Sequence, residues 1–184
     1  MAPEGWQRHM ERRGEPVRFV ADVMLGRLAR WLRALGYDTV YRRDAADRQL
    51  LGLALREDRR LLTRDTALAR LARERGLLIR RDGLDDQLRE VVDASGLPEP
   101  GLLTRCLECN LPLERIGRSA VRDRVPPYTF ATQVEFQTCP GCGRVYWPGT
   151  HAASILARLR PFRGGSGRSR AEGAPDRARP QLRG

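Results

Sequence analysis

The sequence contains no lysine. All 34 basic residues are arginine, and against 23 acidic residues they give a formal net charge of +11 at pH 7. A bias toward arginine codons would account for the missing lysine, but it does not account for the excess of positive charge. A surface this positive attracts polyanions, and nucleic acid is the first candidate among them.

Long apolar runs and aromatic side chains are also scarce. No apolar stretch approaches the ~18 residues that indicate a membrane span, and "MAPEGWQRHMERRGEP" lacks a hydrophobic signal segment. We therefore expect a cytoplasmic protein without membrane contact. Aromatic residues make up 6% of the chain and apolar residues 41%, so a globular core is expected that consists mostly of Leu, Val and Ala.

Four strand–helix units follow one another after the first 16 residues. The apolar patterns predict strands at 17–22, 38–43, 60–65 and 77–81, and helices at 25–36, 47–58, 66–76 and 84–96. Such alternation predicts an α/β fold with a parallel sheet of about four strands and helices on both faces. Right-handed crossovers place every carboxyl end of a strand at one edge, where ligands bind in sheets of this kind.

The remaining segments differ in composition. We predict a flexible leader at 1–16, a first domain at 17–96, a Pro- and Gly-containing linker at 97–104, and a small cysteine-containing module with a C-terminal helix at 105–162. The polar, arginine-rich segment 163–184 is expected to be a disordered basic tail.

Carboxylates occur where the predicted strands end. Asp22 closes the first strand and Asp65 the third, Asp47 opens the helix after the second strand, and Asp82 follows the fourth. Carboxylates that gather at one edge stay ionised together when a cation offsets their repulsion. Oxygen ligands without nearby His or Cys suit Mg²⁺ or Mn²⁺, ions that activate water and stabilise the leaving oxygen in phosphodiester cleavage.

Each of these aspartates also has a purely structural interpretation. Asp47 is well placed to be the N-cap of its helix, and Asp82 lies where acidic residues favour the helix dipole. Thr63 and Arg64 could contact phosphate, although Arg64 could equally pair with a carboxylate. Arg27 and Arg30 lie away from the apolar face of the helix at 25–36, as does Arg33, and the first two are further candidates for substrate binding.

The four cysteines form two C-x-x-C motifs, Cys106/Cys109 and Cys139/Cys142. Two such turns provide a tetrahedral Cys₄ site for structural Zn²⁺, with no open position for catalysis. Redox dithiols are the alternative. We expect the segment 125–138 between the pairs to form a β-hairpin. Tyr146 and Trp147 could stack on bases but are expected to pack against the module, and the role of His151 is left open.

Several of these stretches together resemble a known family. "FVADVMLGRLARWLRALGYDT", "LLTRDTAL", "RCLECN" and "CPGCGRVYWPGTH" are similar to the Mut-seven C-terminal RNase family, in which a PIN-like nuclease domain carries a zinc ribbon. The resemblance covers roughly residues 17 to 160. It implies a metal-dependent ribonuclease whose acidic positions fall on Asp22 and Asp65, with Asp47 as the third and Asp82 as the fourth. It also implies that the four cysteines are the ribbon ligands.

Three hypotheses follow from the sequence. The first is a ribonuclease that uses Mg²⁺ or Mn²⁺ at Asp22 and Asp65 and binds RNA in part through its zinc ribbon. The second is an RNA- or ribosome-binding adaptor without catalysis. The third is the nuclease half of a toxin–antitoxin pair, against which the attached ribbon argues mildly. Assembly into a homo-oligomer is left open.

Overall fold

A computed structural model describes residues 17–98 and 101–163. The leader predicted at 1–16 lies outside the described residues. So do two residues of the predicted linker, 99 and 100, and the predicted tail from residue 164 onward.

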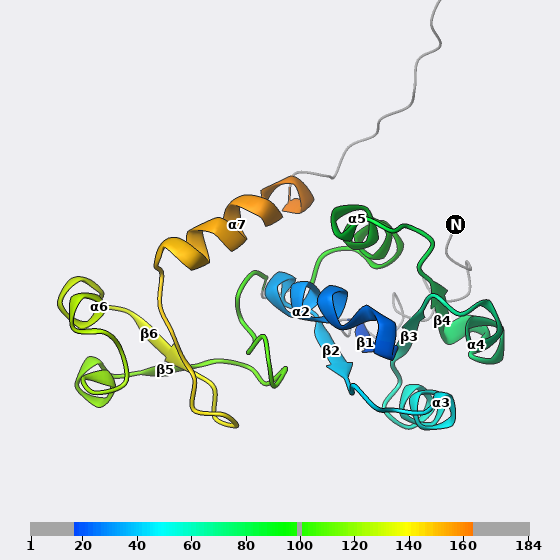
Figure 1. Ribbon diagram of the computed structural model, residues 1–184, viewed down its shortest axis with the longest axis horizontal. Coiled ribbons are helices and arrows are strands. Elements are labelled where there is room, and N and C mark those ends of the chain that lie inside the picture. The colour runs from blue at the N-terminus through cyan, green and yellow to red at the C-terminus, as the bar shows by residue number, and fades with distance from the viewer. Residues whose placement is uncertain (1–16, 99–100, 164–184) are drawn as a thin grey trace, which may run out of the picture.

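Four parallel strands form the central sheet, as the sequence predicted. They are β1 (Arg18–Ala21), β2 (Asp38–Tyr41), β3 (Arg60–Thr63) and β4 (Gly76–Leu78), hydrogen-bonded in the order β2-β1-β3-β4 (Figure 1). The fourth strand is shorter than expected and ends at Leu78. Each strand is followed by helical structure, which is the alternation that places all four carboxyl ends at one edge.

Helices cover both faces of this sheet. The helices are α2 (Gly26–Leu35), α3 (Asp47–Arg56), α4 (Thr66–Leu71) and α5 (Leu84–Ser95), with short 3₁₀ turns η1 (Val23–Leu25) and η2 (Arg73–Arg75). Side chains alternate along β1, because successive strand residues point to opposite faces. Phe19 and Ala21 pack in one apolar cluster with α2 and α5, whereas Val20 packs in another with α3 and α4.

The strand order creates a switch point between β1 and β3. The chain leaves β1 toward β2 on one side and then returns across β1 to β3 on the other. Ligands of open α/β sheets bind in the crevice at such a point, outside the carboxyl ends of the strands. The segments that begin at residue 22 and at residue 64 flank this position.

The second module is a small antiparallel sheet in the order β5-β6-β7, which comprises β5 (Glu114–Ile116), β6 (Phe136–Thr138) and β7 (Val145–Tyr146). The expectation of a β-hairpin at 125–138 was wrong. This segment forms helix α6 (Pro127–Thr132) before β6, after the 3₁₀ turn η3 (Arg118–Val121). The physical reason is that Pro126 and Pro127 fix φ and lack an N–H, which suits the first turn of a helix.

Helix α7 (Thr150–Arg163) returns from the ribbon to the first domain, and Figure 1 shows it running from the small sheet toward α5. Ile155, Leu159 and Phe162 are buried in the same apolar cluster as Leu28 and Leu88. The C-terminal helix is therefore part of the core of the first domain, while the ribbon also has a small apolar cluster of its own around Val121 and Phe136. No helix within the described residues is long and apolar enough to span a bilayer.

Candidate active site and metal centre

Asp22 and Asp65 lie at neighbouring strand exits and are linked through Thr63. The Asp22 side chain is 5% exposed. Its Oδ1 accepts a hydrogen bond from the backbone N–H of Val23 at 2.6 Å, and its Oδ2 accepts one from the Thr63 hydroxyl at 2.7 Å. The same hydroxyl accepts a bond from the backbone N–H of Asp65 at 3.0 Å. One buried threonine thus fixes both aspartates relative to each other.

Asp65 is the N-cap of α4. Its Oδ1 accepts hydrogen bonds from the backbone N–H groups of Ala67 and Leu68, at 2.6 and 2.9 Å. The structural interpretation of this aspartate is therefore correct as far as Oδ1 is concerned. Within the described residues Oδ2 accepts no hydrogen bond, and the side chain is exposed. A cap that uses one oxygen leaves the other free to face a ligand.

Within residues 17–98 and 101–163, no arginine forms an ion pair with either of these carboxylates. Among the ion pairs formed by the described residues, none includes Asp22 or Asp65. Burying an ionised carboxylate costs free energy unless hydrogen bonds or a cation offset it. Asp22 is buried and forms no ion pair with the arginines that the structure describes, so its charge favours the binding of a cation from solution.

The two other predicted carboxylates are placed differently. Asp47 is exposed and is the first residue of α3, but the N-cap is Ala46, whose N–H donates to the Gln49 side chain instead. The N-cap interpretation of Asp47 was therefore wrong. The Asp82 side chain is 87% exposed and pairs with Arg64. Within residues 17–98 and 101–163, no group of three or more carboxylates is compact enough to hold an ion.

The arginines predicted on α2 also differ in their surroundings. Arg27 and Arg30 are exposed, and Arg30 pairs with Glu108 at 2.7 Å. Arg33 was expected to lie away from the core, but it is buried. Its guanidinium donates to the backbone carbonyls of Thr39, Leu107 and Glu108 at 2.8–2.9 Å. Nothing in the helical pattern of α2 signals this role, because it depends on a segment more than 70 residues away.

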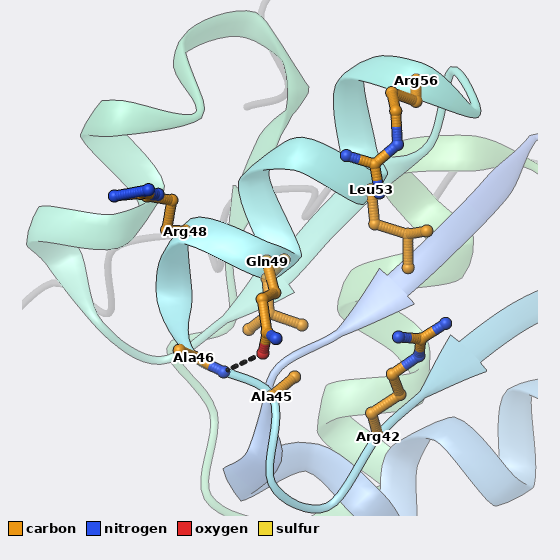
Figure 2. Close-up of a pocket in the computed structure, with 8 residues that line it drawn as sticks. Arg42, Ala45, Ala46, Arg48, Gln49, Leu53 and Arg56 are labelled. Carbon is orange, nitrogen blue, oxygen red and sulfur yellow. Dashed lines mark hydrogen bonds between the residues drawn. The ribbon is translucent and has the colours of Figure 1, made fainter.

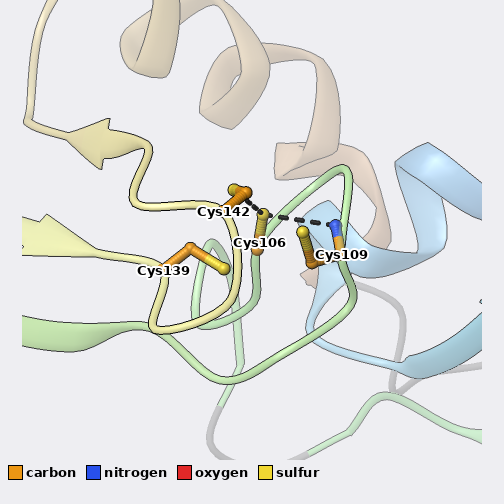
Figure 3. A group of neighbouring side chains, drawn as sticks. All are labelled: Cys106, Cys109, Cys139 and Cys142. Atoms are coloured by element: carbon orange, nitrogen blue, oxygen red, sulfur yellow. Dashed lines mark hydrogen bonds between the residues drawn. The ribbon is translucent and has the colours of Figure 1, made fainter.

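The four cysteines converge on one point (Figure 3). Their sulfur atoms all lie within 4.8 Å of one another, with Cys106 Sγ and Cys142 Sγ 3.8 Å apart. Zn–S bonds of about 2.3 Å in a tetrahedron separate the sulfurs by about 3.8 Å. The cluster is thus of the right size and chemistry to hold zinc, as the motif spacing predicted.

The thiols are not equivalent. Burial raises the pKa of Cys106, but hydrogen bonds to its sulfur from the Tyr146 hydroxyl and from backbone N–H groups outweigh that effect and lower the pKa to about 6. A hydrogen bond with Cys142, followed by burial and the charge of Cys106, raises the pKa of Cys109 to about 12. Without a cation the four sulfurs therefore cannot all be thiolates, and zinc is the ion that a set of four thiolates suits.

The first knuckle is anchored to the parallel sheet. Arg33 binds the carbonyls of Leu107 and Glu108, between the two cysteines of the motif. Asn110 accepts a hydrogen bond from the backbone N–H of Thr39 at 2.9 Å and donates one to Asp38 at 2.6 Å. Sequence reasoning missed Asn110. Its available signal was its position directly after a C-x-x-C motif, where its φ of 67° suits asparagine.

The aromatic residues after the second knuckle have structural contacts. Tyr146 packs against the main core and contacts Cys106 Sγ at 3.2 Å through its hydroxyl, and Trp147 packs in the cluster of the ribbon. His151 is exposed in the first turn of α7. All three line a groove of about 1070 Å³ between the ribbon and α7. Their packing agrees with the structural interpretation of Tyr146 and Trp147.

Comparisons with known proteins bear on the whole arrangement. A family model described as the Mut7-C RNAse domain matches residues 17–159, well over half of the 184 residues. No curated protein and no solved structure matched the chain. The matched segment contains both the aspartates at the sheet edge and the four cysteines. This chain therefore belongs to the Mut7-C RNase domain family, which indicates a ribonuclease-type enzyme.

Proposed function

We propose that this protein is a PIN-like, metal-dependent ribonuclease that hydrolyses phosphodiester bonds of RNA at the edge where Asp22 and Asp65 lie. The observation that carries the proposal is Asp22 itself. It is buried at the switch point of the sheet, held by two hydrogen bonds, and without an arginine partner among the described residues. The family match supports RNA as the substrate.

The donor set fits Mg²⁺ or Mn²⁺, since it offers carboxylate oxygens and a hydroxyl with no His or Cys beside them. Asp22 and Asp65 would hold the ion, and Asp47 is the proposed third carboxylate. When bound, such an ion activates water and stabilises the leaving oxygen. Asp82 is the weakest candidate of the four, because it already pairs with Arg64.

The remaining groups of the chain have supporting roles in this proposal. Thr63 holds Asp22 and Asp65 in register through its hydroxyl. The exposed arginines Arg27, Arg30 and Arg64 attract the phosphate backbone to an otherwise acidic edge. The zinc ribbon is structural and adds to RNA binding. A cytoplasmic location and a homo-oligomeric state are not needed for this chemistry and stay predictions.

The test is cleavage of a labelled mixed-sequence RNA with Mn²⁺, with Mg²⁺ and without divalent ions, by wild-type protein, Asp22→Asn and Asp65→Asn. Asparagine caps a helix about as well as aspartate, so Asp65→Asn removes the charge and keeps the cap. We expect both variants to lose at least about a hundredfold in activity, since even indirect metal contacts are worth 10–100-fold. Asp93→Asn, an exposed change on α5, is the matched control.

Two results would count against the proposal. Cleavage at the wild-type rate by both asparagine variants would exclude Asp22 and Asp65 as the site. Intact RNA under every condition, with RNA binding retained, would favour the non-catalytic adaptor instead. Because chelators can also strip the Cys₄ site, the zinc content must be measured in each sample.

A further inference from the structure

A positively charged pocket begins beside this acidic sheet edge. The segment after β2 and helix α3, through to its last residue Arg56, line an open pocket of about 630 Å³ (Figure 2), a size typical of small-ligand sites. Arg42, Arg48 and Arg56 line it, and no acidic residue does. Figure 2 shows Arg42 and Arg56 pointing toward Leu53 from opposite sides, whereas Arg48 points away.

Some arginines among the described residues have carboxylate partners, and those of the pocket do not. Arg30, Arg59, Arg64, Arg89, Arg144 and Arg158 pair with carboxylates. Within the described part of the chain, the guanidinium groups of Arg42 and Arg56 form no ion pair and donate no hydrogen bond to another side chain. Two guanidinium groups that point toward one pocket and have no acidic partner favour the binding of an anion between them.

The strand register places this pocket beside Asp22. Ala21 is opposite Tyr41 in the β1–β2 pair, so Arg42 follows β2 at the level where Asp22 follows β1. Adjacent strands are about 4.8 Å apart. By alternation both residues belong to the face that Val20 and Val40 share with α3. Arg42 thus lies on the face and at the edge where the proposed catalytic carboxylates lie, whereas Arg56 reaches the pocket from the last turn of α3.

We infer that this pocket is a phosphate subsite for the RNA strand, in which Arg42 and Arg56 bind a backbone phosphate that neighbours the scissile one. The inference rests on the proposed function for the identity of the strand. The carboxylates and their ion act on one phosphate, and the arginines hold the next. Arginine suits this task because its planar fork binds phosphate oxygens in a bidentate manner.

Gly52 gives a selective way to disturb the subsite. A Cβ at this position in α3 would lie 2.8 Å from Nη1 of Arg56, so Gly52→Ala must displace that guanidinium. The displaced atom is the end of a flexible side chain, and alanine favours a helix interior over glycine. This variant should therefore raise the midpoint of thermal unfolding while it weakens RNA binding. Misfolding cannot produce that combination.

The experiment measures fluorescence anisotropy of a short 2′-O-methyl RNA, which resists cleavage, without divalent ions. The proteins are the full-length zinc form of wild type, Arg42→Ala/Arg56→Ala, Gly52→Ala and the control Arg160→Ala, an exposed arginine on α7. We expect at least about tenfold weaker binding for the double variant, since charged hydrogen bonds are strong. Its slope of log K against log salt should be shallower by about 0.7, the value for one lost phosphate contact on a single strand.

The two proposals fail in different ways. If the double variant binds RNA as tightly as Arg160→Ala, with the same salt slope, the subsite is overturned even if the wild type cleaves RNA. If the wild type never cleaves RNA but the double variant still loses binding, the subsite stands and the nuclease proposal falls. Unchanged binding in Gly52→Ala would overturn the assignment of Arg56.

Discussion

At the scale of single residues, Asp65 shows how one side chain can be both a cap and a candidate ligand. Its Oδ1 accepts two backbone N–H groups of α4. The two interpretations available from the sequence are therefore compatible. Asp22 is the stronger evidence for a metal site. Burying a carboxylate that forms no ion pair with any described residue lowers the stability of the fold, so a purely structural role does not explain it.

Arg33 is the residue whose role differs most from expectation. It lies in the middle of an amphipathic helix, yet its guanidinium ties three carbonyls of β2 and the first knuckle together. Burial lowers the pKa of this arginine, while the nearby Cys106 and Glu108 raise it. The cost of dehydrating the guanidinium is thus offset by carbonyl and negative partners.

We predict that Arg33→Met lowers the free energy of unfolding by about 3 kcal/mol, because it leaves buried carbonyls without donors. Urea unfolding of the zinc form measures this change. Arg27→Met on the same helix is exposed and should cost less than about 0.5 kcal/mol. Equal effects of the two substitutions would contradict a specific role for Arg33.

At the scale of elements, α7 holds the ribbon and the parallel sheet together. Ile155, Leu159 and Phe162 are buried with residues of α2 and α5. On the surface, Arg158 pairs with Asp85 at 2.9 Å and lies over the ring of Trp31. The helix therefore belongs to the core of the first domain as much as to the ribbon from which it emerges.

We predict that Leu159→Ala lowers the free energy of unfolding by about 2–4 kcal/mol, since Leu159 is 0% exposed in the core of the first domain. Leu156→Ala, at a position that is 37% exposed, should cost less than about 1 kcal/mol. Denaturant unfolding should show a single transition in both variants. Two separate transitions in the wild type would mean that the ribbon folds independently of the sheet.

At the scale of the whole molecule, the charge is distributed unevenly. The net charge of +11 coexists with an acidic point at the switch of the sheet, where Asp22 and Asp65 lie. Several arginines pair with carboxylates, whereas those of the pocket beside α3 form no ion pair with any residue that the structure describes. Such a surface attracts the phosphate backbone of RNA, while the acidic edge of the sheet favours the binding of a cation.

We predict that the binding constant of the wild type for a short single-stranded RNA, measured without divalent ions, falls with a log–log salt slope of about −2 or steeper. That slope corresponds to about three neutralised phosphates at 0.7 each. Titrations at a series of KCl concentrations measure it. A slope near zero would show that electrostatic attraction is not what holds the RNA.

Local patterns predicted much of this structure. The four strand–helix units were predicted because apolar periodicity is encoded within each segment, and the Cys₄ cluster because the spacing of two C-x-x-C motifs favours a shared metal site. The segment 125–138 was predicted wrongly because β-favouring residues near Phe136 outweighed the helix-starting prolines in the prediction. The local preferences of these residues for strand or helix do not show which of the two wins in the folded protein.

The sequence by itself determined the parallel sheet, the order of its elements and the four sulfur ligands, since these follow from short-range patterns and spacing. Only the tertiary structure decided which residues meet across long separations. It placed Thr63 between Asp22 and Asp65, buried Arg33 under the first knuckle, and set Arg42 beside the acidic edge. Such contacts depend on strand order and packing, because residues distant in the chain become neighbours only when the sheet and its core have formed.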